Sequence, residues 1–385
     1  MAEEIFRQDG YMFEFEAVVT SVSGDGVTLS ETAFYPGGGG QVCDTGTIRG
    51  LKVTEAFYEG DEIVHIVPGN DLKVGDRIWC SVDWDRRYDL MKGHTGEHLL
   101  FCSLKAQATN LQIRKIFISP DSKYVVVDQD MDWEAIGEAI RFANDRIKDN
   151  LSITKAIMSR DDPGLEDVRM NLERIDSDEI SVVSIGDIDH SACSGLHLME
   201  TGEIGMIIVE RKASLGKDGV AIHFKVGDDA KEFALGRSML SHQMIDAMDS
   251  KPEDALKTLR NLKSDSARSS DAVERLVETI MESAKPTRVR DVDVFGFALP
   301  DVKRNSITDH LDVLKGRGVA YFLMEGGTVM VLGGNGISAS KVLSRVIKEF
   351  NGKGGGRDDF AQGSVPHGID FDLLRNSIED AISHQ

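Results

Sequence analysis

Two pairs of side chains that commonly bind metals, about 100 residues apart, constrain the fold of this chain more than any other feature of its sequence. The first pair is His94 and His98, and the second is Cys193 and His197. Within each pair the two residues are four positions apart. If one ion binds both pairs, the fold must bring two distant segments of the chain together.

The first pair lies in a predicted helix from about Tyr88 to Lys105, whose apolar positions are Leu90, Met91, Leu99, Leu100 and Leu104. Residues at i and i+4 project from one face of a helix, close enough to share an ion. Alone, this spacing is more typical of ordinary core or surface histidines. The second pair adds a thiolate and an imidazole, after a predicted strand over 180–185 and the acidic loop Asp187–His190.

Three nitrogens and one sulfur make a donor set that suits zinc. We therefore predict one zinc per chain at His94, His98, Cys193 and His197, with His190 supporting a ligand or lying at the surface. Four protein ligands are typical of a structural zinc, whereas a catalytic zinc keeps one position open. The sequence leaves both roles open.

A rival interpretation comes from the same helix, which contains the H-x-x-E-H order of inverted zinc proteases. Glu97 would then be the general base for peptide hydrolysis. Nothing in that class of enzyme requires Cys193 or His197. We therefore rank the protease interpretation below the two functions described next.

The distribution of apolar, glycine and turn residues predicts an α+β protein in four parts. Residues 1–87 are expected to form a barrel-like β-domain around a glycine motif, and residues 88–227 a mixed α+β zinc domain. Residues 228–285 are expected to form a helical hairpin or dimerisation arm, because apolar residues recur at helical spacing. Residues 286–385 alternate strands and helices, which predicts a compact α/β domain with a glycine loop. Within these parts the pattern predicts a hairpin turn over 23–26, helices over 133–148 and 306–315, and strands over 153–158 and 319–324.

Composition and charge limit the cellular location and the partners that we expect for the chain. It has no apolar run of the roughly 20 residues that would cross a bilayer. Its start lacks the pattern of a secretory signal, and its four cysteines are scattered, so we expect a cytoplasmic protein. The net charge is −21, but residues 231–385 carry 21 basic and 23 acidic residues, which leaves −19 for residues 1–230. A nearly neutral C-terminal part leaves a nucleic-acid partner open.

A glycine motif near the N-terminus is the first of several motifs that resemble those of a known family. Phe34–Gln41 reads F-Y-P-G-G-G-G-Q and precedes Asp44-Thr45-Gly46. Alone it would predict a tight turn. Followed by H-T-x-x-H-L-L and C-x-G-x-H, it closely resembles the editing domain of alanyl-tRNA synthetases and the free-standing AlaX editing proteins. Residues 211–224 resemble the end of that domain, and residues 352–363 resemble the glycine-rich C-terminal domain of the synthetase.

The resemblance is to the long form of AlaX and covers nearly the whole chain, without the aminoacylation domain of a synthetase. It implies hydrolysis of tRNA(Ala) mischarged with serine or glycine, acting in trans. It also implies that His94, His98, Cys193 and His197 bind zinc. Separately, the apolar helical stripe makes the helical and C-terminal region a candidate for homodimer formation. A tRNA-binding or regulatory protein with a structural zinc is the alternative.

The family resemblance extends to three residues near the expected site. Gln41 matches a glutamine near the editing pocket, and Thr32 matches a threonine that lines the amino-acid pocket. Glu97 departs from the family pattern, as do Ser194 and Leu196 beside the second pair. We expect Glu97 to line the pocket, where it would bind the substrate's ammonium group or orient water. The alternative is an exposed glutamate that only supports its helix.

The C-terminal glycine run, Gly352–Gly363, lacks the G-K-[ST] ending of a nucleotide-binding P-loop. Its backbone N–H groups, with Lys353 and Arg357, could contact phosphates. Its glycines could equally serve close packing. Both interpretations stay open at the level of sequence.

Overall fold

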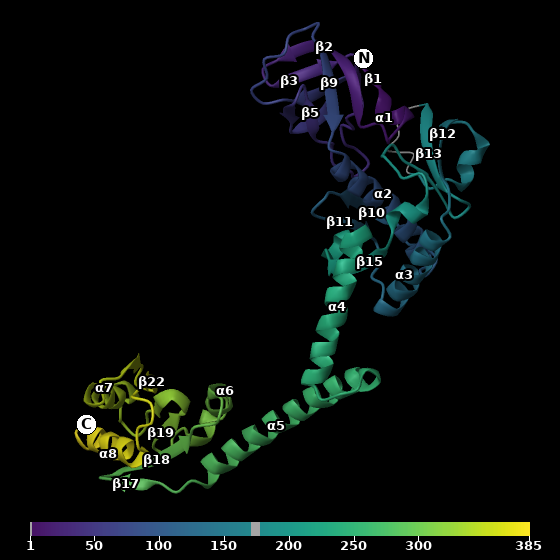
Figure 1. The fold of residues 1–385 in the computed structure, drawn as a ribbon. Helices are drawn as coiled ribbons and strands as arrows, with labels where there is room; N and C mark the ends of the chain where they lie inside the picture. The colour runs from purple at the N-terminus through teal and green to yellow at the C-terminus, as the bar shows by residue number, and fades with distance from the viewer. Residues whose placement is uncertain (1, 171–177) are drawn as a thin grey trace. The chain divides into compact units, whose positions relative to one another are not determined.

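A computed structural model describes residues 2–170 and 178–385. The chain divides into two compact units, residues 1–243 and residues 244–385, which are described separately (Figure 1). Within the described residues, no helix has both the length and the apolar character needed to cross a bilayer.

The first unit begins with a seven-stranded antiparallel sheet in the order β6-β5-β9-β2-β3-β8-β7. Its strands are β2 (Glu14–Ser23), β3 (Gly26–Leu29), β5 (Gly46–Ile48), β6 (Leu51–Val53), β7 (Glu55–Glu59), β8 (Glu62–Ile66) and β9 (Arg77–Val82). The two edge strands, β6 and β7, are consecutive in the chain with only Thr54 between them. The sheet therefore curls until its edges meet, as expected for a nearly closed barrel.

Short elements form a separate two-stranded sheet. Strand β1 (Glu3–Glu4) pairs in parallel with β4 (Glu31–Thr32), and the short helix α1 (Ile5–Gln8) lies between them in the sequence. The predicted hairpin is present, since β2 and β3 pair through a turn at Gly24 and Asp25.

Helix α2 (Trp84–Lys105) is the centre of the unit and is buried along most of its length. Asp83 begins it, because its carboxylate accepts a hydrogen bond from the backbone N–H of Arg86. The helix thus starts four residues before the predicted Tyr88, and the expected domain boundary at residue 87 falls inside it. The earlier start was missed because Trp84 and Tyr88 have only modest helix propensity.

A four-stranded antiparallel sheet packs on α2. Its order is β10-β11-β16-β15, with β10 (Ile113–Ile118), β11 (Lys123–Val127), β15 (Ile207–Ser214) and β16 (Val220–Val226). Helix α3 (Trp133–Lys148) has the predicted bounds and packs beside α2. A Cβ added to Gly96 of α2 would lie 2.8 Å from Val226, so helix and sheet are in close contact.

A three-stranded antiparallel sheet completes the first unit. Strands β12 (Ile153–Ser159) and β13 (Glu179–Ile185) were predicted, and β14 (Asp189–Ala192) was not. The segment predicted as an acidic loop is therefore partly a strand. Helix α4 (Gly227–Ala247) follows β16.

The second unit is a six-stranded sheet with flanking helices, in the order β17-β18-β19-β20-β22-β21. Its elements are α5 (Ala255–Ser283), β17 (Thr287–Val289), β18 (Val292–Leu299), α6 (Arg304–Thr308), β19 (Val319–Met324), β20 (Thr328–Leu332), α7 (Ala339–Glu349), β21 (Lys353–Gly356), β22 (Phe360–Ser364) and α8 (Phe371–Ser383). Only β18 and β19 pair in parallel. The compact α/β domain over residues 286–385 remains a prediction.

Two details of the second unit correct the sequence-based expectation. The glycine loop is an antiparallel hairpin, because β21 and β22 pair from Lys353 with Ser364 to Gly356 with Ala361. The helix predicted from Ser306 to Lys315 is a short α-helix followed by a 3-10 turn at Leu311–Leu314. The mixed α+β class with a nearly closed sheet is confirmed. The division into four parts and the helical hairpin remain predictions, since α4 lies mostly in the first unit and α5 in the second.

Candidate metal centre

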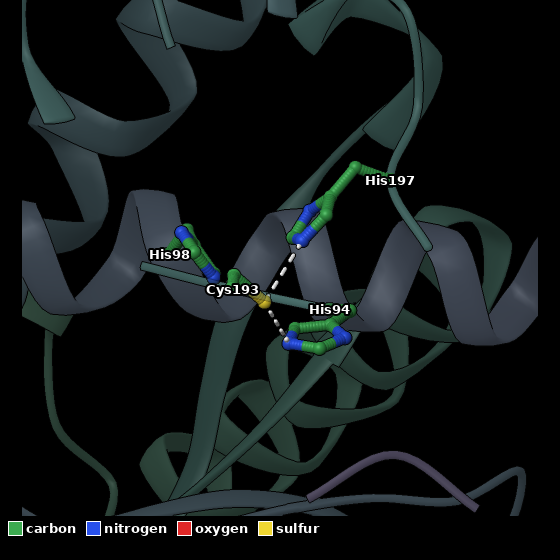
Figure 2. A group of neighbouring side chains, drawn as sticks. All are labelled: His94, His98, Cys193 and His197. Atoms are coloured by element: carbon green, nitrogen blue, oxygen red, sulfur yellow. Dashed lines mark hydrogen bonds between the residues drawn. The ribbon is translucent and has the colours of Figure 1, made fainter. Parts of the chain in front are cut away.

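Four side chains from two distant segments converge inside the first unit (Figure 2). His94 and His98 project from α2, whereas Cys193 and His197 lie in the loop that follows β14. One potential ligand atom from each residue lies within 4.8 Å of those of the others. The structure therefore brings together the four residues for which the sequence predicts a shared ion.

The loop carrying the second pair is held against α2 by backbone contacts. The backbone N–H of Cys193 donates to the carbonyl of Ser181 on β13 (2.9 Å), and that of Leu198 donates to the Thr95 hydroxyl (3.1 Å). Gly195 lies so close to α2 that an added Cβ would be 2.2 Å from Cε1 of His94. A glycine at this position is therefore required for the approach of the two segments.

Each of the three imidazoles is oriented by a hydrogen bond at Nδ1. The partners are Gln41 Oε1 for His94 (2.9 Å), Asp189 Oδ2 for His98 (3.1 Å) and Thr95 Oγ1 for His197 (3.3 Å). The Nε2 atoms of His94 and His197 then face the Cys193 sulfur, at 3.4 Å and 3.3 Å. Metal-binding histidines are usually held in this way, with one ring nitrogen hydrogen-bonded and the other free for the ion.

The electrostatics of the cluster also favour a cation. Burial disfavours the thiolate, yet His94 and His197 hold the pKa of Cys193 well below its ordinary value. Burial lowers the pKa of His197 to about 3, so that ring is neutral. Burial would also lower the pKa of His98, but the hydrogen bond to Asp189 and the neighbouring Cys193 raise it to about 10. A thiolate and a neutral His197 ring are ready to bind zinc, whereas binding through His98 would displace its proton. The three nitrogens and one sulfur fit this ion.

The glycine motif reaches the cluster through Gln41. Its four glycines, Gly37–Gly40, all have positive φ, which other residues rarely adopt. Gly38 pairs with Gln41 in a tight turn, and Gln41 pairs with Ile118 at the end of β10. While Gln41 Oε1 holds His94, its Nε2 is buried without a hydrogen-bond partner. That amide N–H group is free to donate to a ligand.

Glu97 is fully buried, with 0% of its surface exposed, which excludes the exposed-helix interpretation of this residue. Neither of its carboxylate oxygens has a hydrogen-bond partner. The nearer one, Oε2, lies 4.0 Å from Nε2 of His98. A buried carboxylate without a partner is costly, so its retention beside the cluster points to a ligand that completes it.

Thr32 occupies a different environment. It is fully buried, its hydroxyl lies 2.9 Å from Nε2 of His65, and it accepts a hydrogen bond from the backbone N–H of Phe34. Among the described residues, none of its hydrogen bonds reaches the four-residue cluster. Its expected place in the amino-acid pocket therefore remains a prediction.

His190 is not among the four clustered residues, and its Nδ1 lies 2.8 Å from the Ser184 hydroxyl.

Sequence reasoning missed three residues that support the site. Asp189 orients His98 and also accepts a hydrogen bond from Ser191 (2.7 Å). Thr95 orients His197, and the guanidinium of Arg169 lies 3.4 Å from Asp189. Thr95 could have been found from its place between the two histidines. Asp189 and Arg169 carry no local signal, because only the pairing of β13 with β14 brings Asp189 to the site.

Comparisons with known proteins agree with this geometry. Residues 5–86 match the family "tRNA synthetases class II (A)", and residues 303–384 match "DHHA1 domain". Residues 180–218, which include Cys193 and His197, match "Threonyl and Alanyl tRNA synthetase second additional domain". Alanyl-tRNA editing protein AlaX-L of Pyrococcus horikoshii is 27% identical over 399 residues, which is 95% of each chain.

The chain is therefore similar to an alanyl-tRNA editing protein along nearly its whole length. It is also similar to longer proteins. The alanine–tRNA ligases of Pyrobaculum neutrophilum and Ignicoccus hospitalis are 26% and 28% identical to this chain, over 99% and 93% of it. The match covers 44% and 40% of those ligases, so the chain spans less than half of their length.

Among solved structures, the C-Ala domain of Aquifex aeolicus alanyl-tRNA synthetase is 21% identical, with a TM-score of 0.24. It covers 26% of this chain and 98% of that domain. A TM-score of this size is too low for an inference about the fold.

Proposed function

We propose that this protein is an aminoacyl-tRNA deacylase that removes wrongly attached serine or glycine from tRNA(Ala), in trans, at a site containing one zinc. The observation that carries the proposal is the convergence of His94, His98, Cys193 and His197, each imidazole held through Nδ1. The similarity of the chain to alanyl-tRNA editing protein AlaX-L supports the substrate class.

The proposed zinc would be held by those four residues. When bound, it would supply Lewis-acid chemistry, which positions the amino group of the substrate or acidifies a water molecule. Asp189 and Thr95 would keep the rings of His98 and His197 in place, since their hydrogen bonds to Nδ1 leave Nε2 of each ring available to a metal.

Two buried polar groups beside the cluster are free to act on the substrate. The Glu97 carboxylate, which has no hydrogen-bond partner, would accept a hydrogen bond from the α-ammonium group or from the attacking water. The free amide N–H of Gln41 would donate to the ester carbonyl, where negative charge develops during hydrolysis. Both groups are fixed before the substrate arrives, because they belong to packed backbone elements.

The other expected properties are proposals of the same kind. The α5 side chains Leu256, Leu259, Leu262, Leu276 and Ile280 are exposed apolar groups at helical spacing, which supports a homodimer formed through this region. The C-terminal part, residues 286–385, would bind tRNA, and the protein would act in the cytoplasm. Residues 1–87 and 88–227 would be the glycine-motif and zinc domains, with residues 228–285 as the connecting arm.

The purified protein should be incubated separately with Ser-, Gly- and Ala-tRNA(Ala), and with a casein digest. The proposal predicts release of serine, glycine or both, slower release of alanine, and no peptide cleavage. Binding of tRNA without hydrolysis would indicate a regulatory protein with a structural zinc. Cleavage of casein, abolished by Glu97→Gln, would replace the proposal with a metalloprotease.

A further inference from the structure

The four-stranded sheet has a second face, opposite the one that packs on α2. Side chains alternate along a strand, and Ile118, Val125 and Phe224 are buried on the α2 side. Their chain neighbours Phe117, Tyr124 and His223 therefore lie on the other face. Phe117 pairs with Tyr124, Tyr124 with His223, and His223 with Arg211. These four residues, termed here the aromatic row, cross all four strands of the sheet.

The members of the aromatic row are in contact and partly exposed. The rings of Phe117 and Tyr124 are stacked, with centroids 5.3 Å apart and an interplanar angle of 28°. Tyr124 and His223 have centroids 4.9 Å apart, and Nη2 of Arg211 lies 3.4 Å from Nδ1 of His223. The three rings are half-buried and Arg211 is exposed. The side chains on the face that packs on α2 are fully buried. The partly exposed aromatic row therefore does not belong to the core between the sheet and α2.

The charge around the aromatic row is positive, in a part of the chain that is strongly acidic. Lys115 and Lys225 lie two positions from Phe117 and His223, and therefore on the same face. With Arg211 they add three positive charges, whereas residues 1–230 carry a net charge of −19. Burial and Arg211 lower the pKa of His223, although Glu210 opposes this, so its ring is neutral and can stack.

The aromatic row is directly continuous with the segment that touches the metal centre. Ile118, the next residue after Phe117, donates its backbone N–H to Gly40 (2.8 Å) and accepts from Val42 (3.1 Å). Gln41, between those two, holds His94. A chain lying along this face could therefore pass the edge of β10 at the glycine motif and reach the cluster. In Figure 1, β10 and β11 lie next to α2.

We propose that the aromatic row is a stacking platform for the unpaired 3′ nucleotides of the aminoacyl-tRNA, whose phosphates contact Lys115, Arg211 and Lys225. This inference rests on the proposed function, because it assumes that the substrate is an ester at the 3′ end of an RNA. Every base offers a face to an aromatic ring, and exposed aromatics on a four-stranded sheet are a common way of binding single-stranded RNA. The basic flanks favour RNA over an apolar protein partner.

The test is a binding measurement on the full-length, zinc-containing protein. The probes are an uncharged RNA hairpin copying the acceptor stem of tRNA(Ala) with its unpaired 3′ end, and the same hairpin trimmed to a blunt end. Fluorescence anisotropy at one fixed salt concentration should give tighter binding of the hairpin with the 3′ end. In the double variant Phe117→Leu with Tyr124→Leu, we expect that Kd to rise by about 10- to 100-fold, as for lost base stacking. The Kd of the blunt hairpin should not change.

Matched variants separate stacking from folding. Tyr124→Phe keeps a ring and should bind like the wild type, and Trp79→Leu removes an exposed aromatic from β9 and should have no effect. Zinc content and circular dichroism establish that each variant is folded. A double variant that binds both hairpins like the wild type would overturn the inference. A change in self-association with no change in RNA binding would also overturn it, in favour of a protein partner.

Binding of uncharged RNA is independent of hydrolysis, so the two proposals can fail separately. If the wild type hydrolyses no aminoacyl-tRNA but the double variant loses affinity for the unpaired end, only the proposed function fails. If the wild type hydrolyses Ser-tRNA(Ala) and the double variant does so with an unchanged KM, only the stacking platform fails.

Discussion

At the scale of single residues, Glu97 is the side chain whose environment most needs a ligand. It is fully buried, and both oxygens lack hydrogen-bond partners. We expect Glu97→Gln to keep zinc and to lower the deacylation rate of Ser-tRNA(Ala) by roughly ten- to a thousand-fold, as for loss of one oriented polar group. The same change keeps the volume of the side chain, so the Tm should stay close to that of the wild type. Glu232→Gln, an exposed change on α4, is the control. Unchanged deacylation in Glu97→Gln would rule out a role in the reaction.

His65, inside the barrel, provides a prediction about pH. Its Nδ1 lies 3.0 Å from the carbonyl of Val27, its Nε2 lies 2.9 Å from Thr32, and burial lowers its pKa to about 4. The unfolded chain therefore binds a proton between about pH 6.5 and 4 that the folded protein does not, so stability falls as pH falls. From pH 7 to pH 5 this amounts to about 2 kcal/mol.

Urea unfolding of chelator-treated protein at both pH values measures this contribution. The difference in free energy of unfolding between wild type and His65→Gln should be largest at pH 7 and shrink by about 2 kcal/mol at pH 5. An identical pH dependence in the two proteins would mean that folding does not lower the pKa of His65.

At the scale of elements, the contact between the glycine motif and β10 positions Gln41 at the metal centre. A Cβ added to Gly40 would lie 2.7 Å from the Ile116 carbonyl, and its φ is +90°. Gly40→Ala should therefore displace Gln41 from His94 and weaken zinc binding by about 10- to 100-fold, measured by competition with a chelator. Gly60→Ala is the matched control, since its φ is +63° and nothing lies within 4 Å. Equal zinc affinity in both variants would show that the contact between Gly40 and β10 does not affect zinc binding.

Elements with a strong local signal were predictable from the sequence. Helix α3 has the predicted bounds because Asp132 caps it, and the strands over β12, β13 and β19 are apolar enough to be recognised. Strands β14 and β21 were missed, because D-H-S-A and K-G-G-G contain almost no strand-forming residues. Both are strands only because a neighbour pairs with them, and β14 carries Asp189 to the site. The four clustered residues were predictable, whereas their hydrogen-bond partners depended mostly on tertiary structure.

At the scale of the whole molecule, the charge is divided unevenly. Residues 1–230 carry −19 and should repel phosphates outside the aromatic row, whereas residues 231–385 carry −2. We expect residues 1–243, the first compact unit, to retain hydrolysis but to bind tRNA(Ala) at least several-fold more weakly than the full chain. Affinity should be compared at the same salt concentration. Equal affinity would show that residues 244–385 do not anchor the tRNA.

The central claim is that one zinc at the four-residue cluster is required for deacylation. The most direct measurement removes the metal with a chelator, restores zinc in steps, and follows the deacylation rate of Ser-tRNA(Ala) against zinc content. The rate should rise in proportion to bound zinc and level off at one ion per chain, and Cys193→Ala should neither retain the ion nor recover activity. Full deacylation by a folded, zinc-free protein, or full zinc content in Cys193→Ala, would contradict the account.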